Sequence, residues 1–503
     1  MNRREFLTRT AAAPLAPAAA QNGSPRFKAG FAQRDITPDL GMEQPGGYGK
    51  AFHRSFHDAC KVRAAVFDDG RTRVALVGVD ALMVPRRLVL QVREEVQRRC
   101  GIPPEGVLIG ASHSHSSGPT GMIQPGEYDG ASALVRQLAY EKSSCADAGY
   151  LERVRLEMVT AVCHADSFRA EARIGFGFGI ESQSGFNRRI RMKNGLSYSH
   201  PQQGNPDIVG YAGPVDPQVG AIGVWGRDGR LMGCIVNFAC HATTNPGGIS
   251  ANWIHYLEKT IRGALDTEAP VIFLQGACGD VTQVDNLSPY ANPSGEQWAR
   301  MVGGRVGAEA VKALLSMTAG EEAPIASASR TLRIERRRPS PERIRQAHEL
   351  VRKDPKEAGS TDWTFAKEIV LLEALLAREP AAEVEIQAVQ VGPAVFITNP
   401  AEFFCQYGLD LKAGSPFPFT FPVELANGCV GYVPTEEAFG EHGGGYETRL
   451  TSYSNLEITA GRRMVEAGLE LARGMRPGRV PERAKAPAFR EPWSYGNLPP
   501  QVR

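Results

Sequence analysis

Runs of apolar residues alternate along the chain with segments whose apolar positions recur at helical spacing. Leu88, Val92 and Val96 recur every four residues and stop at Gly101, and residues 254–265 carry a second stripe of this kind. Apolar, β-rich runs lie at residues 74–82, 107–111, 233–240, 271–275 and 389–398. Because this alternation is typical of α/β proteins, we predict a central sheet, mixed or mostly parallel, that is flanked by helices.

Two segments depart from this pattern. Residues 339–379 are dense in Glu, Lys, Arg, Leu and Ala and predict a pair of helices, with Trp363 and Phe365 near the bend. This helical insertion either packs on the side of the domain or forms part of a substrate lid. From Arg476 onward the chain is rich in Pro and Arg and loses its periodicity, which predicts an irregular surface tail over residues 476–503.

The N-terminus has the features of an export leader. An Arg-Arg pair at residues 3–4 precedes Phe6 and a short apolar stretch, which ends in three alanines at residues 18–20. These features predict a twin-arginine signal peptide over residues 1–20 and export to the periplasm or the extracellular space. No later window reaches the roughly 20 apolar residues that a membrane-spanning helix needs, so we expect no transmembrane segment.

Composition and charge narrow the classes of function. The chain has 503 residues, 42% of them hydrophobic and 22% charged, which is enough apolar material for a large core. A formal net charge of +2 gives no sign of a nucleic-acid partner, and the basic triplet at residues 336–338 is better explained as a solvated face. A neutral surface is still compatible with peripheral contact to lipid through an exposed apolar rim.

The cysteines do not form a recognisable motif. Nine are scattered without a C-x-x-C pair, which excludes a zinc ribbon or a thioredoxin-like redox motif. Cys234, Cys240 and Cys278 lie inside apolar runs and are expected to be buried free thiols. An odd total also excludes complete pairing within the chain.

Polar side chains follow the predicted strands where the strands end. The exits carry Asp80, the segment Ser112 to Pro119 with His113 and His115, then His241, Asp280 and Glu402. Ligands of open α/β sheets bind beyond the carboxyl ends of the strands, so these side chains are candidates for one site. The remaining histidines are assigned to helices (His164, His255, His348) or loops (His53, His57, His200, His442) and treated as background.

The His-x-His pair suggests a metal centre. On an extended segment, side chains two residues apart point to the same side, so His113 and His115 are predicted to face one another. Neutral imidazole is a preferred zinc ligand, and a catalytic zinc site usually takes three protein ligands and a water. We expect His113, His241 and Glu402 to supply those ligands, while His115 accepts and donates protons during the reaction. A single histidine after a strand is more often structural, and it is the grouping of three that favours a site.

At these residues the chain resembles the neutral (non-lysosomal) ceramidase family over most of its mature length. The matching segments are Asp35-Ile36-Thr37-Pro38, Gly46-Gly47-Tyr48-Gly49, the 111–119 segment around His113, Asn237 to Thr243 around His241, Gly279-Asp280-Val281-Thr282, Pro400-Ala401-Glu402-Phe403 and Tyr446-Glu447. Asn187-Arg188 resembles a further segment, whose Arg lies in the family's active site. The resemblance implies a zinc hydrolase domain over residues 21–475.

Carried over by motif, the resemblance implies one zinc ion per chain, held by His113, His241, Glu402 and Tyr446. It also implies active-site roles for Arg188 and for the position of Thr282, whereas the catalytic role of His115 is inferred from its place beside His113. The chain departs from the family in three places. Thr282 stands where the family has an active-site Ser, and no counterpart of a second active-site Tyr is evident among residues 453–461. From the short irregular tail after Met475 we also expect the immunoglobulin-like C-terminal domain of many members to be lacking.

The function implied is that of an exported zinc-dependent amidohydrolase. Zinc would lower the pKa of a bound water, the resulting hydroxide would attack the carbonyl of an N-acyl amide, and His115 would pass the proton to the leaving amine. The substrate would be a small amphipathic or lipid-like amide such as a ceramide. Two alternatives stay open: a metal-dependent hydrolase of a small polar ester, amide or phosphate, and an inactive binding homologue. A serine esterase is excluded, because the chain lacks a G-x-S-x-G motif.

Overall fold

The computed structural model describes residues 27–496 and 498–503. The predicted export leader, residues 1–20, lies outside the described residues. Within them, the main feature is a nine-stranded sheet in the order β12-β11-β10-β5-β1-β2-β3-β4, with β14 beside β5. Its strands are β1 (Lys28–Asp35), β2 (Lys61–Asp68), β3 (Arg73–Val79), β4 (Val107–Ala111), β5 (Ala170–Ile180), β10 (Gln218–Gly226), β11 (Leu231–Phe238), β12 (Val271–Gln275) and β14 (Ala319–Gly320).

The sheet is mixed, one of the two arrangements that the apolar pattern allowed. The β3–β4 and β11–β12 pairings are parallel, whereas β1, β2, β5 and β10 pair with their neighbours in antiparallel fashion. Parallel neighbours end at the same edge of a sheet, so β4 and β11 each release their polar exit segment beside a parallel partner. These two exits carry the histidine motifs.

A second sheet packs against the first. It has the order β15-β16-β17-β19, with strands β15 (Ile325–Glu335), β16 (Ala381–Val391), β17 (Ala394–Thr398) and β19 (Phe419–Val423). The prediction of one strand over residues 389–398 was wrong: Gly392, at a φ of 59°, turns the chain before Pro393, and β16 and β17 form a hairpin. Only a residue without a Cβ adopts that backbone cheaply.

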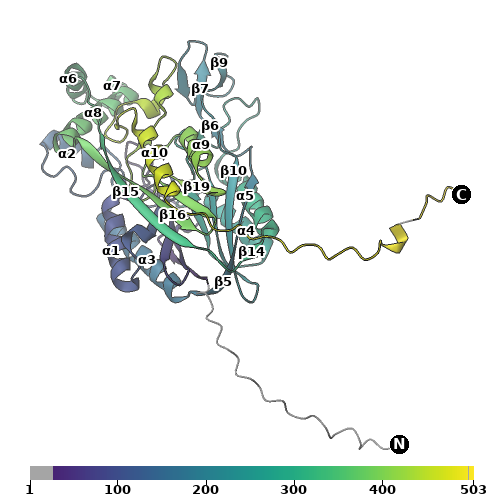
Figure 1. The fold of residues 1–503 in the computed structure, drawn as a ribbon. Coiled ribbons are helices and arrows are strands. Elements are labelled where there is room, and N and C mark those ends of the chain that lie inside the picture. Colours follow the sequence, from purple (N-terminus) through teal and green to yellow (C-terminus); the bar gives the residue numbers. More distant parts are fainter. Residues whose placement is uncertain (1–26, 497) are drawn as a thin grey trace, which may run out of the picture.

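Helices cover the outer faces of both sheets, which gives four layers (Figure 1). Side chains from alternate strand positions, such as Leu76 and Phe396, meet between the sheets, and Val77 and Ile397 face helices. The large sheet is covered by α1 (Arg86–Cys100), α3 (Ala148–Ser167), α4 (Trp253–Leu265) and α5 (Gly295–Ser316), the small one by α9 (Cys405–Gly414) and α10 (Ala460–Arg473). Among the described residues, we find no helix with the length and apolarity needed to cross a membrane.

The helical insertion is confirmed as an element and packs on the side of the molecule. It contains α6 (Pro341–Leu350), α7 (Pro355–Ala358) and α8 (Ser360–Arg378), and α8 shares an apolar cluster with α2 (Ala133–Tyr140). The Lys367 ammonium group of α8 donates to the backbone carbonyl of Tyr48 at 2.5 Å, and the Phe365 ring lies 5.9 Å from the Tyr48 ring. The insertion therefore supports the loop that carries Tyr48.

Short elements complete the fold. They are β6 (Phe186–Asn187), β7 (Arg189–Met192), β8 (Ser197–Ser199), β9 (Ile208–Tyr211), β13 (Val281–Thr282), β18 (Glu402–Phe403), β20 (Tyr432–Val433), and the 3₁₀ turns η1 (Pro104–Gly106), η2 (Glu436–Phe439), η3 (Tyr446–Thr448) and η4 (Ser494–Gly496). In the described part of the tail, the backbone N–H of Gly478 donates a hydrogen bond to the carbonyl of Gly392, and the Arg483 guanidinium donates one to the carbonyl of Ser316. Every described residue after Arg483 is exposed, and the C-terminal end of the ribbon extends away from the body of the fold (Figure 1).

Candidate metal centre

Side chains from three strand exits meet at one point. His113 follows β4, His241 follows β11, and Glu402 opens β18 just after β17. The two histidine segments touch through a parallel bridge between Ser114 and Ala242. All three side chains are 1–2% exposed, so the group is buried.

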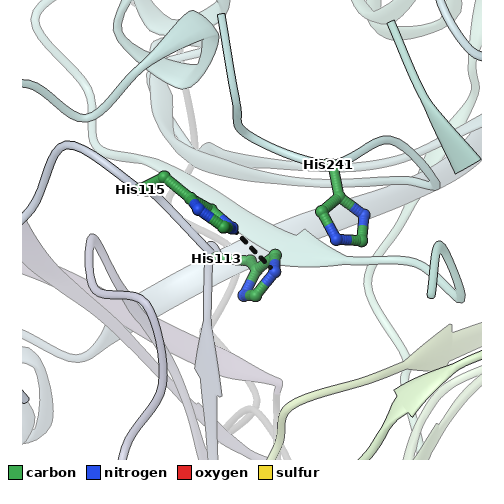
Figure 2. Close-up of side chains that lie close together, drawn as sticks. All are labelled: His113, His115 and His241. Atoms are coloured by element: carbon green, nitrogen blue, oxygen red, sulfur yellow. Dashed lines mark hydrogen bonds between the residues drawn. The ribbon is translucent and has the colours of Figure 1, made fainter. Parts of the chain in front are cut away.

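The backbone at His113 differs from the extended segment that we predicted. His113 has a left-handed backbone with a φ of 61°. A left-handed residue turns the chain, so the two-residue alternation of a strand does not apply here. The rings of His113 and His115 nevertheless meet, with 3.2 Å between their Nε2 atoms, and Figure 2 shows His241 beside them.

Hydrogen bonds fix which ring nitrogen of each histidine faces the centre. Nδ1 of His113 lies 3.0 Å from the carbonyl of Leu82, and Nδ1 of His241 lies 2.7 Å from the carbonyl of Cys278. A carbonyl only accepts, so each Nδ1 carries a proton and each Nε2 of the neutral ring keeps its lone pair. Both Nε2 atoms point at Oε2 of Glu402, at 3.2 Å and 3.1 Å.

Such a convergence of acceptors fits a cation. Two imidazole lone pairs and a carboxylate oxygen repel one another unless a proton or a metal ion lies between them. Nitrogen and carboxylate oxygen are the donors that zinc sites commonly combine. His113, His115 and His241 also offer nitrogens that all lie within 4.8 Å of one another. Because the Nε2 atoms of His113 and His241 both face Glu402, we favour Glu402 over His115 as the third ligand.

The electrostatics keep most of the group in metal-binding form. Burial lowers the pKa of His241 to about 3, assisted by the neighbouring Arg188 guanidinium, and burial with the adjacent imidazoles lowers the pKa of His115 well below its usual value. Burial alone would raise the pKa of Glu402, but His113 and His241 hold it well below its usual range. Burial opposes protonation of His113, yet the charge of Glu402 raises its pKa. Glu402 is therefore ionised, and His115 and His241 are neutral.

Arg188 reaches the centre from β6 and β7. Its Nη1 donates to Nε2 of His241 at 3.2 Å, its Nε to Glu447 at 2.7 Å and its Nη2 to the carbonyl of Gly279 at 2.8 Å. Glu447 neutralises the buried charge and fixes the direction of the guanidinium. The neighbouring Arg189 points elsewhere, with its guanidinium over the Phe404 ring.

Thr282 and Tyr446 line the same cavity without touching Glu402. The Thr282 hydroxyl donates to Oε1 of Gln283 at 2.9 Å. The hydroxyl of Tyr446 lies 3.3 Å from that of Tyr432, and the ring of Tyr446 packs against the Arg188 guanidinium. Both side chains therefore belong to the lining of the cavity, and within the described part of the chain neither forms a hydrogen bond to His113, His241 or Glu402.

The centre opens into a cavity of about 450 Å³ whose wall surface is more apolar than polar, although the polar groups of the site also line it. Its lining includes Tyr48, Leu82, Met122, Val284, Trp298, Tyr432 and Tyr453. Among the described residues that line it, Arg188 is the only arginine or lysine. A larger cavity, of about 660 Å³, shares Met122 and Tyr453 with it. That cavity is lined by several arginines and glutamates and holds none of the histidines, so the chemistry belongs to the smaller one.

Two residues of the site escaped the sequence analysis. The Tyr453 hydroxyl donates to Oε1 of Glu402 at 2.7 Å, although no tyrosine in the 453–461 segment was assigned to the site. His200, placed among the background histidines, lines the cavity near Arg188. Neither residue follows a strand of the large sheet, and no spacing in the sequence connects either one to the histidine motifs.

Asp80 and Asp280 hold backbone segments and do not orient the imidazoles. Asp80 accepts from Lys61 N and from the Arg63 guanidinium, both at 2.8 Å, and Asp280 accepts from Asn187 and from Cys405 N. The imidazoles of the centre are instead oriented by backbone carbonyls. Of the two roles that the sequence left open for these aspartates, the structure favours support of the loops.

A buried carboxyl group lies behind His241. Glu424 is fully buried after β19, where its Oε2 accepts from Cys278 N at 3.0 Å and from Phe403 N at 2.8 Å. Its Oε1 lies 2.9 Å from Sγ of Cys278. The Cys278 carbonyl holds His241, and Phe403 follows Glu402, so Glu424 joins two of the segments that carry the candidate ligands.

The fold and this site together define an α/β protein with a candidate metal centre in an apolar cavity. Comparison with known proteins shows which proteins this chain is similar to in sequence and in fold. The chain is 25% identical over 284 residues to the neutral ceramidase of Pseudomonas aeruginosa, and its fold matches a ceramidase solved in complex with C2 at a TM-score of 0.64. The chain is thus similar to a neutral ceramidase over about half of its sequence and shares the fold of the ceramidase structures, which confirms the resemblance drawn from its motifs and the mixed α/β fold.

The extent of these matches differs between sequence and structure. The sequence match spans 53% of this chain but only 38% of the length of the curated relative. The structural matches, which include a crystal structure of the Pseudomonas aeruginosa neutral ceramidase at a TM-score of 0.62, cover 92% of this chain and 77% of each neighbour at 18% identity. No family model matches the chain.

Proposed function

We propose that this protein is an exported, zinc-dependent amidohydrolase that cleaves the N-acyl bond of a ceramide-like lipid amide. One observation carries the proposal: the Nε2 atoms of His113 and His241 converge on one oxygen of Glu402 inside an apolar cavity. The match to a protein named neutral ceramidase supports the choice of substrate class. The twin-arginine motif of residues 3–4 supports export.

We assign one zinc ion per chain to His113, His241 and Glu402, with Tyr446 as a fourth ligand. When bound, zinc would polarise the amide carbonyl and lower the pKa of a water molecule. The carbonyls of Leu82 and Cys278 orient the two imidazoles for this role.

Three side chains of the cavity perform the remaining steps. His115 is neutral and lies beside His113, so it accepts the proton of the attacking water and returns it to the leaving nitrogen. Arg188, held by Glu447, stabilises the negative charge that develops on the acyl oxygen. Thr282 offers a hydroxyl in the same cavity to orient the amide.

The walls of the cavity favour a lipid amide over a polar substrate. Aromatic and aliphatic side chains release water when an acyl chain binds, which stabilises the complex by about 25 cal/mol per Å² of apolar surface. A phosphate substrate would call for cationic groups to pair with its negative charges, and Arg188 is already paired with Glu447. The alternative of a hydrolase for a small polar substrate is therefore less well supported by this cavity.

Metal analysis combined with a substrate panel tests the proposal. Purified wild-type protein and the variant His113→Ala are analysed for zinc, then assayed on short- and long-chain ceramides, other N-acyl amides, a polar ester and a phosphate ester. We expect one zinc per wild-type chain, with zinc and amide cleavage lost together in the variant. The matched control is His348→Ala on α6, outside the cavity, which should keep both.

Each outcome separates the candidate functions. Zinc with cleavage of the polar ester or phosphate alone would identify the runner-up hydrolase. Wild-type protein that stays inert on all substrates after zinc is supplied would contradict the proposal and leave a binding homologue.

A further inference from the structure

Two cysteines outside the candidate site lie close enough to react with one another. Sγ of Cys100, the last residue of α1, is 3.0 Å from Sγ of Cys163, near the end of α3. All nine cysteines of the chain lie within the described residues and are free thiols. Both members of this pair are partly exposed, whereas Cys234, Cys240 and Cys278 are buried.

The surroundings of the pair hold the two helices together. Glu95 of α1 and Arg155 of α3 form an ion pair at 3.6 Å, and Asp166, three residues beyond Cys163, accepts from Arg73 at 3.0 Å. Both thiols pack against the apolar core beneath the helices. Because an ion pair links the two helices on one side and Arg73 of β3 anchors the end of α3 on the other, the sulfur atoms stay neighbours.

We propose that Cys100 and Cys163 form a disulfide bond that ties α1 to α3 when the folded protein meets a disulfide oxidant. A sulfur–sulfur bond is about 2.0 Å long, so closing the present 3.0 Å gap requires a shift of about 1 Å, within reach of small side-chain rotations. Cysteine pairs of this kind persist in oxidising compartments.

The chemistry balances with oxidised glutathione as the oxidant. One protein thiolate attacks a glutathione sulfur, forms a mixed disulfide and releases one glutathione thiolate. The second protein thiolate then attacks the protein sulfur of the mixed disulfide, forms the Cys100–Cys163 bond and releases the second glutathione. The two protein thiols lose two electrons and two protons, which appear as two molecules of reduced glutathione.

The bond would close a covalent loop around part of the candidate metal centre. The chain between Cys100 and Cys163 contains β4 and the segment that carries His113 and His115. A cross-link reduces the freedom of that loop in the unfolded chain and so stabilises the folded state. The inference does not depend on the proposed hydrolase activity.

Thiol counting tests the proposal on the folded wild-type protein. The protein is incubated with oxidised glutathione under native conditions, unfolded, treated with a thiol-specific alkylating reagent, and analysed by mass spectrometry of its peptides. We expect free thiols to fall from nine to seven and the peptides of Cys100 and Cys163 to be joined. The oxidised protein should also unfold at a temperature higher by a few degrees, on the order expected for a cross-link of this span.

Variants make the assignment specific. Cys100→Ser and Cys163→Ser should each keep eight free thiols after oxidation and lose the rise in unfolding temperature. Cys145→Ser is the matched control, because Cys145 is partly exposed like the pair and its thiol contacts backbone carbonyls and Lys50 rather than another cysteine. This variant should fall from eight free thiols to six. Nine free thiols in oxidised wild-type protein, or glutathione that stays attached to either cysteine, would overturn the proposal.

Discussion

Glutamate 424 should make the stability of this protein fall as the pH rises, and replacing it with glutamine should abolish that effect. Burial raises the pKa of Glu424 to about 8, against the opposing influence of the Cys278 thiol and of backbone N–H groups. The folded state therefore keeps a proton on this carboxyl group at neutral pH. The unfolded chain releases it near the ordinary pKa of 4.5.

The sign and size of the effect follow from proton binding. Below pH 4.5 both states carry this proton, so Glu424 contributes no pH dependence to the free energy of unfolding there. Between pH 4.5 and 8 the folded state binds more protons than the unfolded state, so the free energy of unfolding falls as the pH rises. At about 1.36 kcal/mol per pH unit, this interval amounts to at most about 5 kcal/mol.

The variant Glu424→Gln isolates this contribution, because glutamine reproduces the contacts of the protonated acid. Its amide oxygen can accept from Cys278 N and Phe403 N, and its amide nitrogen can donate to the Cys278 sulfur. Relative to the variant, the wild-type protein should lose several kcal/mol of stability between pH 4.5 and 8. Urea denaturation of both proteins from pH 4 to pH 9 measures this difference.

A surface variant separates the effect of Glu424 from general changes in charge. Glu268→Gln alters a side chain that is 95% exposed and should give a pH profile parallel to the wild type. Parallel profiles of wild type and Glu424→Gln would refute the reasoning, since they would mean that the folded and unfolded states hold this proton equally. A difference that grows in favour of the wild type at high pH would show that Glu424 is ionised and stabilising.

Three further variants probe other parts of the structure. Burial opposes ionisation of Glu258, yet neighbouring basic groups lower its pKa to about 2. Glu258→Gln should therefore lower the free energy of unfolding by up to about 3 kcal/mol at pH 7, and by less as the pH falls toward 2. Urea denaturation that gives an equal loss at pH 3 and pH 7 would contradict this. Tyr453→Phe removes a hydrogen bond to the Glu402 carboxylate and should lower the affinity for zinc about tenfold or more, measured by competition with a chelator. An unchanged affinity would show that Tyr453 does not support the metal ligand. In Gly46→Ala the new Cβ would lie 2.2 Å from Nδ1 of His115, and Gly46 has a φ of 111° that alanine rarely adopts. The variant should cleave the amide at least about tenfold more slowly, while circular dichroism shows a folded protein. Full activity would show that the loop can move away.

Much of the local structure could be predicted from the sequence. The runs at residues 107–111 and 271–275 coincide with β4 and β12, and the stripe through Leu88, Val92 and Val96 lies in α1. These predictions succeed because an apolar period reports how each side chain is buried relative to its own helix or strand. The hairpin at Gly392 was missed because its two strands are equally apolar, and the turn between them is only two residues long.

The arrangement of the site needed the tertiary structure. Polar residues at strand exits identified His113, His241 and Glu402 as neighbours, because ligands gather at the ends of strands. The carbonyls that orient the imidazoles, the contact of Tyr453 with Glu402 and the support from Glu424 come from segments far apart in the chain. The spacing of residues within one segment gives no indication of contacts between segments that are far apart in the chain.

The sequence by itself determined the α/β class, the helical insertion, the histidine motifs and the resemblance to the neutral ceramidases. Only the tertiary structure decided that the sheet is mixed, that a second sheet packs on it, and that His113 turns toward its partners through a left-handed backbone. The physical reason is that the spacing of apolar residues along a helix or strand indicates which of its side chains are buried. The pairing of strands and the contacts between side chains far apart in the sequence depend instead on how the whole chain packs.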